Sequence, residues 1–198
     1  MSECVLIKSY DEPLFCSKEI LRYAGVKVSD DNILDVLNEC VKEIENKLTY
    51  KVCYIKLPLS IDGKICDFGA FKVSSEKLAL NLKNADDVIV FAATIGIEID
   101  RLIAKYSHIS TVKAVMFQAI GAERIEALCD AFCEDTSINL EADLSPRFSA
   151  GYGDLPLELQ KEIFGVLDCN RHIGLTLNES LVMSPTKSVT AFIGIKYK

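Results

Sequence analysis

The chain has 198 residues, 49% of them hydrophobic and 26% charged, and its formal net charge is -7. These values are typical of one folded globular domain and exclude wholesale disorder. The acidic balance disfavours nucleic acids and anionic membrane surfaces as partners, because both attract basic patches. We therefore expect a single domain over residues 1–198 that binds neither of them.

The eight cysteines are the most unusual feature of the composition. No apolar leader opens the chain, and the longest apolar run, Val88–Ile97, is shorter than the roughly 20 residues that a membrane helix needs. No pair has CxxC spacing, and the chain has only 2 histidines, so a zinc site is disfavoured. We expect buried, reduced thiols in a cytoplasmic protein.

The first part of the chain predicts two helices. A short amphipathic helix over Ser17–Ala24 ends at Gly25, a residue type that commonly terminates helices. Asp30 or Asp31 caps a longer helix whose apolar face runs from Ile33 to Leu48.

A β-rich region follows. Val52–Leu59 predicts a strand, Asp62-Gly63 is a strong hairpin signal, and Ile65–Val73 is the expected returning strand. Ser74 or Ser75 opens a short helix through Leu82, and the apolar run Val88–Ala93 indicates a buried strand.

The clearest predicted element is a helix of about 24 residues that begins at Ser110. Its apolar stripe includes Val112 and Val115, and its polar face carries Glu123, Glu126 and Asp130. The next segment, Asp135–Gly153, has no periodicity and predicts a long loop of the kind that often carries function.

Beyond this loop, Asp154 is expected to cap a helix that runs to about Leu167. Short strands are expected at Leu175–Leu177 and Ser188–Ile195, with a loop through Pro185 between them. Helices and hairpins are mixed without regular βαβ alternation. The fold class is therefore α+β, with a mainly antiparallel twisted sheet flanked by helices.

The stretch from Arg147 to Asp154 is the best candidate for a binding site. An arginine fork can clamp a carboxylate, small residues at 149–151 allow close backbone approach, and Tyr152 adds an aromatic face. Glu126 and Glu141 add negative charge, which suits a zwitterionic or cationic small molecule. A glycine-rich turn whose arginine forms a structural salt bridge is the alternative.

Standard catalytic motifs are missing. The glycines at 151 and 153 are followed by Pro156 where a dinucleotide fingerprint needs its third glycine, and no strand leads into them. Neither a phosphate-binding loop nor GxSxG occurs, and His108 and His172 have no evident partner. We expect no catalytic residue of these classes and no metal ligand.

Two sequence blocks resemble the activation (reactivation) domain of cobalamin-dependent methionine synthase. They are RFSAGYGDLPLELQ at 147–160 and LTLNESLVMSP at 175–185, the latter followed by KSVTA at 187–191. The helix sequence AVMFQAIGAERIEALCDAF at 114–132 also fits, so the similarity extends from about Val88 to Ile195. Ala150 and Asn178 replace the proline and threonine that are usual in the family.

The resemblance implies that the chain binds S-adenosylmethionine and supports reductive methylation of oxidised cobalamin carried by a partner protein. Arg147 would hold the methionine carboxylate, and the backbone near Ser149 and Gly151 would line the ligand. Tyr152 would face the corrinoid, and Glu126 and Glu141 would be acidic contacts. No residue in 1–50 matches the family's N-terminal aspartate.

Two functional hypotheses follow from this resemblance. The first is a free-standing reactivation subunit for a cobalamin-dependent methionine synthase that lacks its own activation domain, rather than an independent enzyme. The second is a small-molecule binding or regulatory protein, with an S-adenosylmethionine-like ligand, that has no methyl-transfer role.

Overall fold

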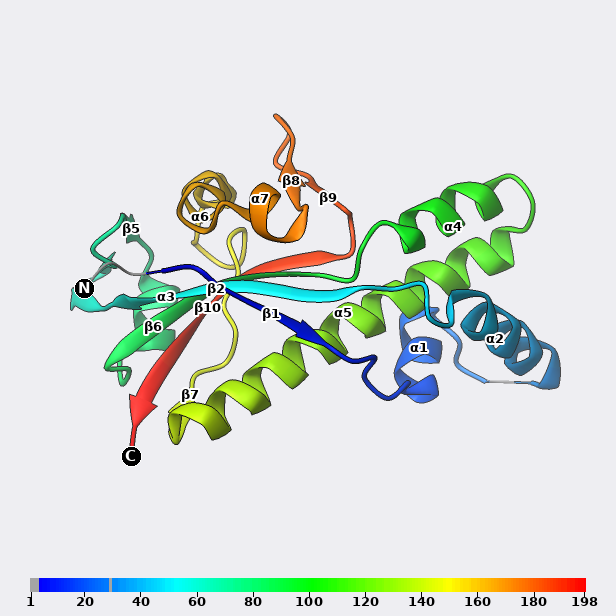
Figure 1. Cartoon of the computed structure of the whole chain (residues 1–198), viewed down its shortest axis with the longest axis horizontal. Coiled ribbons are helices and arrows are strands. Elements are labelled where there is room, and N and C mark those ends of the chain that lie inside the picture. Colours follow the sequence, from blue (N-terminus) through cyan, green and yellow to red (C-terminus); the bar gives the residue numbers. More distant parts are fainter. Residues whose placement is uncertain (1–3, 29) are drawn as a thin grey trace.

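The computed structural model describes residues 4–28 and 30–198 (Figure 1). Its main sheet is antiparallel throughout, which confirms the predicted α+β class. In spatial order the strands are β1 (Leu6–Tyr10), β2 (Tyr50–Pro58), β6 (Asp87–Thr94), β10 (Ser188–Tyr197) and β7 (Ala142–Leu144).

Both faces of this sheet are covered by helices. Figure 1 shows α5 (Thr111–Leu140) on one side and α6 (Gln160–Leu167) and α7 (Cys169–Ile173) on the other. Strand β6 is buried on both faces: Ile89, Phe91 and Ala93 join the α5 side, whereas Val88, Val90 and Ala92 join the α6 side. A continuous apolar run is the sequence pattern that such double burial requires.

The remaining helices are α1 (Ser17–Tyr23), α2 (Asp31–Ile44), α3 (Glu76–Leu82) and α4 (Glu98–Ser107), and a 3-10 turn, η1, covers Leu157–Leu159. The predicted caps are confirmed, because side chains of Asp30, Ser75 and Ser110 accept backbone N–H bonds at the starts of α2, α3 and α5. Helix α2 ends before Leu48, since Asn46 adopts a φ of 58°.

The hairpin at Asp62-Gly63 exists, but its strands differ from those predicted. Its two arms are β3 (Ser60–Asp62) and β4 (Ile65–Asp67), and β5 (Lys72–Ser74) pairs with β4. The single strand expected over Ile65–Val73 is therefore wrong, because a turn at Gly69, with a φ of 76°, divides it. Strand β2 pairs instead with β1 and β6.

Helix α5 is 30 residues long, six more than about 24, and it absorbs residues 135–140 of the predicted loop. Thr136 is buried and Leu140 packs on the core, so tertiary contacts override weak local helix propensity. Val112 and Val115 are 53% and 46% exposed, which corrects their expected place in the core. These early turns of α5 extend beyond the sheet and pack alongside α4.

Several elements were not predicted, among them β7 within the loop expected over 135–153 and α7 after the helix expected to end at about Leu167. Strand β1 forms an edge of the main sheet, and α4 buries Ile99 and Leu102 at helical spacing. Strand β9 (Met183–Ser184) pairs with β8 (Thr176–Leu177), so part of the expected loop before Pro185 is a small hairpin. The final predicted strand is confirmed as β10.

The cysteines are free thiols, and most of them behave as core residues. Cys133 is half-buried, and the expectation of burial is wrong for Cys4 and Cys16, which are exposed. The five buried thiols are Cys40, Cys53, Cys66, Cys129 and Cys169. Across the described ranges, no helix is both long and apolar enough to cross a bilayer.

Candidate functional site

Arg147 lies against α5 and pairs with two of its carboxylates. Its Nη2 is 2.7 Å from Glu126 Oε2, and its Nη1 is 2.6 Å from Asp130 Oδ1. The two acids are four residues apart and therefore share one face of the helix. Burial alone lowers the pKa of Arg147, but the hydrogen bond that Arg147 donates to Asp130 and the other neighbouring groups outweigh it, and the pKa is raised. The guanidinium is permanently charged in this position.

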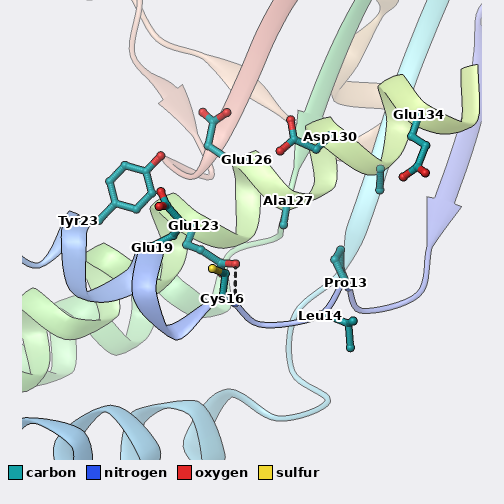
Figure 2. Close-up of a pocket in the computed structure, with 11 residues that line it drawn as sticks. Pro13, Leu14, Cys16, Glu19, Tyr23, Glu123, Glu126, Ala127, Asp130 and Glu134 are labelled. Carbon is teal, nitrogen blue, oxygen red and sulfur yellow. Dashed lines mark hydrogen bonds between the residues drawn. The ribbon is translucent and has the colours of Figure 1, made fainter. Parts of the chain in front are cut away.

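An acidic pocket of about 620 Å³ opens between α1 and α5 beside this ion pair (Figure 2). Figure 2 shows Glu126 and Asp130 rising from α5, with Glu19 and Tyr23 facing them from α1. Ala127 and Ala131 lie on the same stretch of α5 and leave room between the helices. The lining residues are Pro13, Leu14, Cys16, Glu19, Tyr23, Glu123, Glu126, Ala127, Asp130, Ala131 and Glu134.

A buried ion pair fixes one wall of this pocket. Arg124 is 0% exposed, and it forms hydrogen bonds with Glu123 and with the carbonyls of Pro13 and Leu14. Its guanidinium carbon lies 3.9 Å from the ring centroid of Phe15, within cation–π range. Glu123 also accepts the backbone N–H of Cys16 at 3.1 Å. Glu123 therefore belongs to the core, which corrects its predicted place on a solvated face.

The segment that follows Arg147 is a compact, well-bonded loop. We call residues 145–155 the Arg147 loop. Phe148 exchanges two backbone hydrogen bonds with Phe192 of β10, which places Arg147 toward α5 and Phe148 in the opposite core cluster. Gly151 has a φ of 85° and donates its N–H to the Leu155 carbonyl. Tyr152 donates its N–H to the Ser149 carbonyl, and its side chain is 72% exposed.

Asp154 does not cap the helix that follows it, contrary to the prediction. Its carboxylate accepts hydrogen bonds from Ser75 Oγ at 2.6 Å and from the Glu76 N–H at 2.7 Å, at the start of α3. The following helical segment instead begins with η1 after Pro156, and α6 continues to Leu167 as predicted. A long-range contact thus replaces the local one.

The structure brings five of the six predicted site residues into one region and leaves one outside it. Arg147 contacts Glu126, and Ser149, Gly151 and Tyr152 follow within the same loop. Glu141 follows the last turn of α5, roughly 22 Å along the helix from Glu126 at 1.5 Å per residue. The chain then runs antiparallel to β10 through β7 to Phe148, which carries Arg147 away from Glu141.

Several pocket residues were not recognised from the sequence. Glu19 and Tyr23 come from α1, a helix far from the Arg147 loop in sequence, and no local pattern connects the two. A usable signal did exist on α5, where acids recur at helical spacing at positions 123, 126, 130 and 134. This spacing places the four acids on one face of α5, and that face forms the acidic wall of the pocket.

Comparison with known proteins assigns the chain to a family. Residues 75–197 match the family model described as "Vitamin B12 dependent methionine synthase, activation domain". Because this match covers more than half of the chain, the protein belongs to that family, as the two sequence blocks indicated. A search of curated proteins found no match.

A solved structure has the same fold. The chain is similar to the solved structure described as "Crystal Structure of the MetH Reactivation Domain bound to AdoHcy". The TM-score of the comparison is 0.70, and the sequence identity is 15%. The similarity covers 96% of this chain and 78% of the other. The shared architecture therefore includes the N-terminal region, which the family match does not reach.

Proposed function

We propose that this protein binds S-adenosylmethionine and serves as a reactivation subunit for a cytoplasmic cobalamin-dependent methionine synthase. The observation that carries the proposal is the position of Arg147, which projects from a small-residue loop to the rim of an acidic pocket. Family membership and the AdoHcy-bound structure of similar fold support the choice of ligand class.

The charges of the site match those of the ligand. S-adenosylmethionine has an ammonium group, a positively charged sulfur and a carboxylate, so its net charge is positive. Glu126 and Asp130 together outweigh Arg147 by one negative charge. Oppositely charged groups at about 4 Å attract appreciably even near a protein surface. The arginine fork suits the carboxylate, and the acids suit the two cationic groups.

Each predicted residue has a defined part in this proposal. Arg147 holds the methionine carboxylate, and Glu126 attracts the cationic groups. The backbone at Ser149 and Gly151 lies close to the ligand, and exposed Tyr152 faces the partner. Glu141 stays a prediction from the resemblance. It lies far along α5 from Glu126, so a ligand that contacted both residues would have to extend well beyond the pocket.

In this proposal the protein supplies positioning and charge rather than acid–base chemistry. S-adenosylmethionine, when bound, carries an activated methyl group on its sulfur, and the partner contributes cobalamin. The residues of this chain orient the ligand toward the partner and keep its cationic groups near carboxylates. No proton transfer is assigned to any side chain.

Binding is tested by titration calorimetry with S-adenosylmethionine on the wild type, Arg147→Ala and Arg101→Ala. Arg101 is a suitable control because its ion pair is local, with Glu98 three residues away. We expect Arg147→Ala to weaken binding about 10- to 100-fold, the range for a lost charge-assisted hydrogen bond, and Arg101→Ala to bind normally. Absence of wild-type binding contradicts the proposed ligand.

Reactivation is tested by adding the protein to an oxidised, inactive methionine synthase that lacks its own activation domain, together with a reductant and S-adenosylmethionine. We expect activity to recover only when the protein is present. Equal recovery without it contradicts the reactivation role. Binding without any recovery supports the alternative, a small-molecule binding or regulatory protein.

A further inference from the structure

The Arg147 loop is fastened at both ends to one short helix, α3. At its first end, Asn81 Nδ2 donates to the Pro146 carbonyl at 3.1 Å, and Asn81 Oδ1 accepts from Ser145 Oγ at 3.0 Å. At its second end, the Asp154 carboxylate accepts from Ser75 Oγ and from the N–H groups of Glu76 and Lys77. All of these partners lie on α3 or at its cap.

Steric fit reinforces the second attachment. Gly153 has a φ of 63°, a conformation that favours glycine, and a Cβ at this position would lie 2.5 Å from Lys77 Cδ. The Lys77 side chain of α3 thus lies directly against the backbone of Gly153, although it is flexible enough to move aside; the positive φ is the stronger reason for glycine. Negative charge at the start of a helix is also favourable, because backbone N–H groups there lack helical partners. The same contacts hold the pKa of Asp154 below its usual range, with the Ser75 hydrogen bond as the largest cause.

The helix itself is anchored in the core. Leu78 and Leu82 are fully buried in the cluster that also contains Phe192 and Leu155. The Ser75 hydroxyl links α3 to the Arg147 loop, because it accepts the N–H of Leu78 and donates to Asp154. A displacement of α3 would therefore move both ends of the loop together.

We infer that α3 is a brace that positions the Arg147 loop for ligand binding, and that Asn81 and Asp154 are its positioning residues. This inference rests on the proposed function, because the ligand is the one proposed for Arg147. Neither residue contacts the acidic pocket, so each acts through the loop rather than on the ligand. Preorganised loops bind more tightly because less freedom is lost on binding.

The experiment combines backbone amide exchange with S-adenosylmethionine affinity in Asp154→Asn and Asn81→Ala. Asp62→Asn and Asn32→Ala are matched controls, since both residues are exposed and lie outside the loop and α3, on β3 and α2 respectively. We expect Asp154→Asn to accelerate exchange about 10-fold at Gly151, Tyr152 and Leu155, and to weaken binding about 10-fold. Exchange in β6 and β10 stays unchanged.

Exchange and binding together distinguish positioning from a general loss of stability. A merely structural role predicts a lower thermal midpoint with unchanged affinity at temperatures where the variant is folded, and that result overturns the inference. Unchanged loop exchange in both brace variants also overturns it. If the wild type fails to bind S-adenosylmethionine, the proposed function fails, whereas loop exchange still decides whether α3 braces the loop.

Discussion

Arg124 lies on α5 and Arg147 packs against the next turns of the same helix, yet the two arginines have opposite environments. Arg124 is fully buried, and its guanidinium bonds to Glu123, which is 4% exposed, and to the backbone carbonyls of Pro13 and Leu14. The side chain of Arg147 is 25% exposed, and its partners Glu126 and Asp130 line an open pocket. A buried charge that loses its partner is strongly destabilising, whereas an exposed one can exchange partners with water or ligand. The first cluster therefore builds the pocket, and the second is available to a ligand.

The largest expected effect is on the buried cluster. Arg124→Met leaves Glu123 buried without its charged partner and removes the donors to the Pro13 and Leu14 carbonyls. We expect a loss of about 3–5 kcal/mol in the free energy of unfolding, measured by urea denaturation. The double variant with Glu123→Gln should recover part of this loss. A loss below about 1 kcal/mol for the single variant removes the contrast between the two arginines.

A smaller change in stability is expected at the exposed cluster. Arg147→Met removes two ion pairs that are open to solvent, and such pairs contribute about 0–1 kcal/mol each. Urea denaturation should therefore show a change of roughly 2 kcal/mol or less. A loss as large as that of Arg124→Met means that Arg147 has a structural role, which is the alternative interpretation of its salt bridge.

The smallest effect on stability is expected from alkylation of Cys16, whose backbone N–H donates to Glu123 and which lines the pocket. Cys16 is exposed and lines the pocket, whereas burial raises the pKa of the Cys129 thiol and keeps it protonated. Iodoacetamide should modify Cys16 and Cys4 first, as followed by peptide mass spectrometry. Bound S-adenosylmethionine should slow the reaction at Cys16 and leave Cys4 unaffected. Equal rates at Cys16 with and without ligand place the ligand outside this pocket.

Sequence reasoning succeeded where the signal is local. Helix caps at Asp30, Ser75 and Ser110 and the doubly buried strand β6 follow from short-range patterns, and all are present. The Arg147 block and the negative charge of Glu126 were also selected from residue types alone; the structure shows the two residues paired, and their role in ligand binding stays a prediction. The ion pairs of Arg147 with Glu126 and Asp130 also agree with the alternative interpretation, in which Arg147 forms a structural salt bridge. A salt bridge at the rim of a pocket is compatible with ligand binding there.

Sequence reasoning failed where distant segments decide. Asp154 has the spacing of a local cap, yet it binds the start of α3, whose cap residue Ser75 is 79 positions away. Glu123 has the spacing of a solvated face, yet the β1–α1 connection folds over it. Glu141 precedes Arg147 by only six positions in the sequence, but strand pairing with β10 extends the chain between them. Short separation in sequence says little about distance once a strand intervenes.

The pairing of β6 has a practical consequence for protein production. The family match begins at residue 75, but β6 is hydrogen-bonded to β2 along eight residue pairs, from Lys51–Thr94 to Pro58–Asp87. A fragment that starts at residue 75 would leave one entire edge of β6 unpaired and would uncover apolar residues on both of its faces. Exposed edges of this kind promote aggregation. The segment shared with the family is thus not an autonomous folding unit, and expression should retain the N-terminal strands and helices.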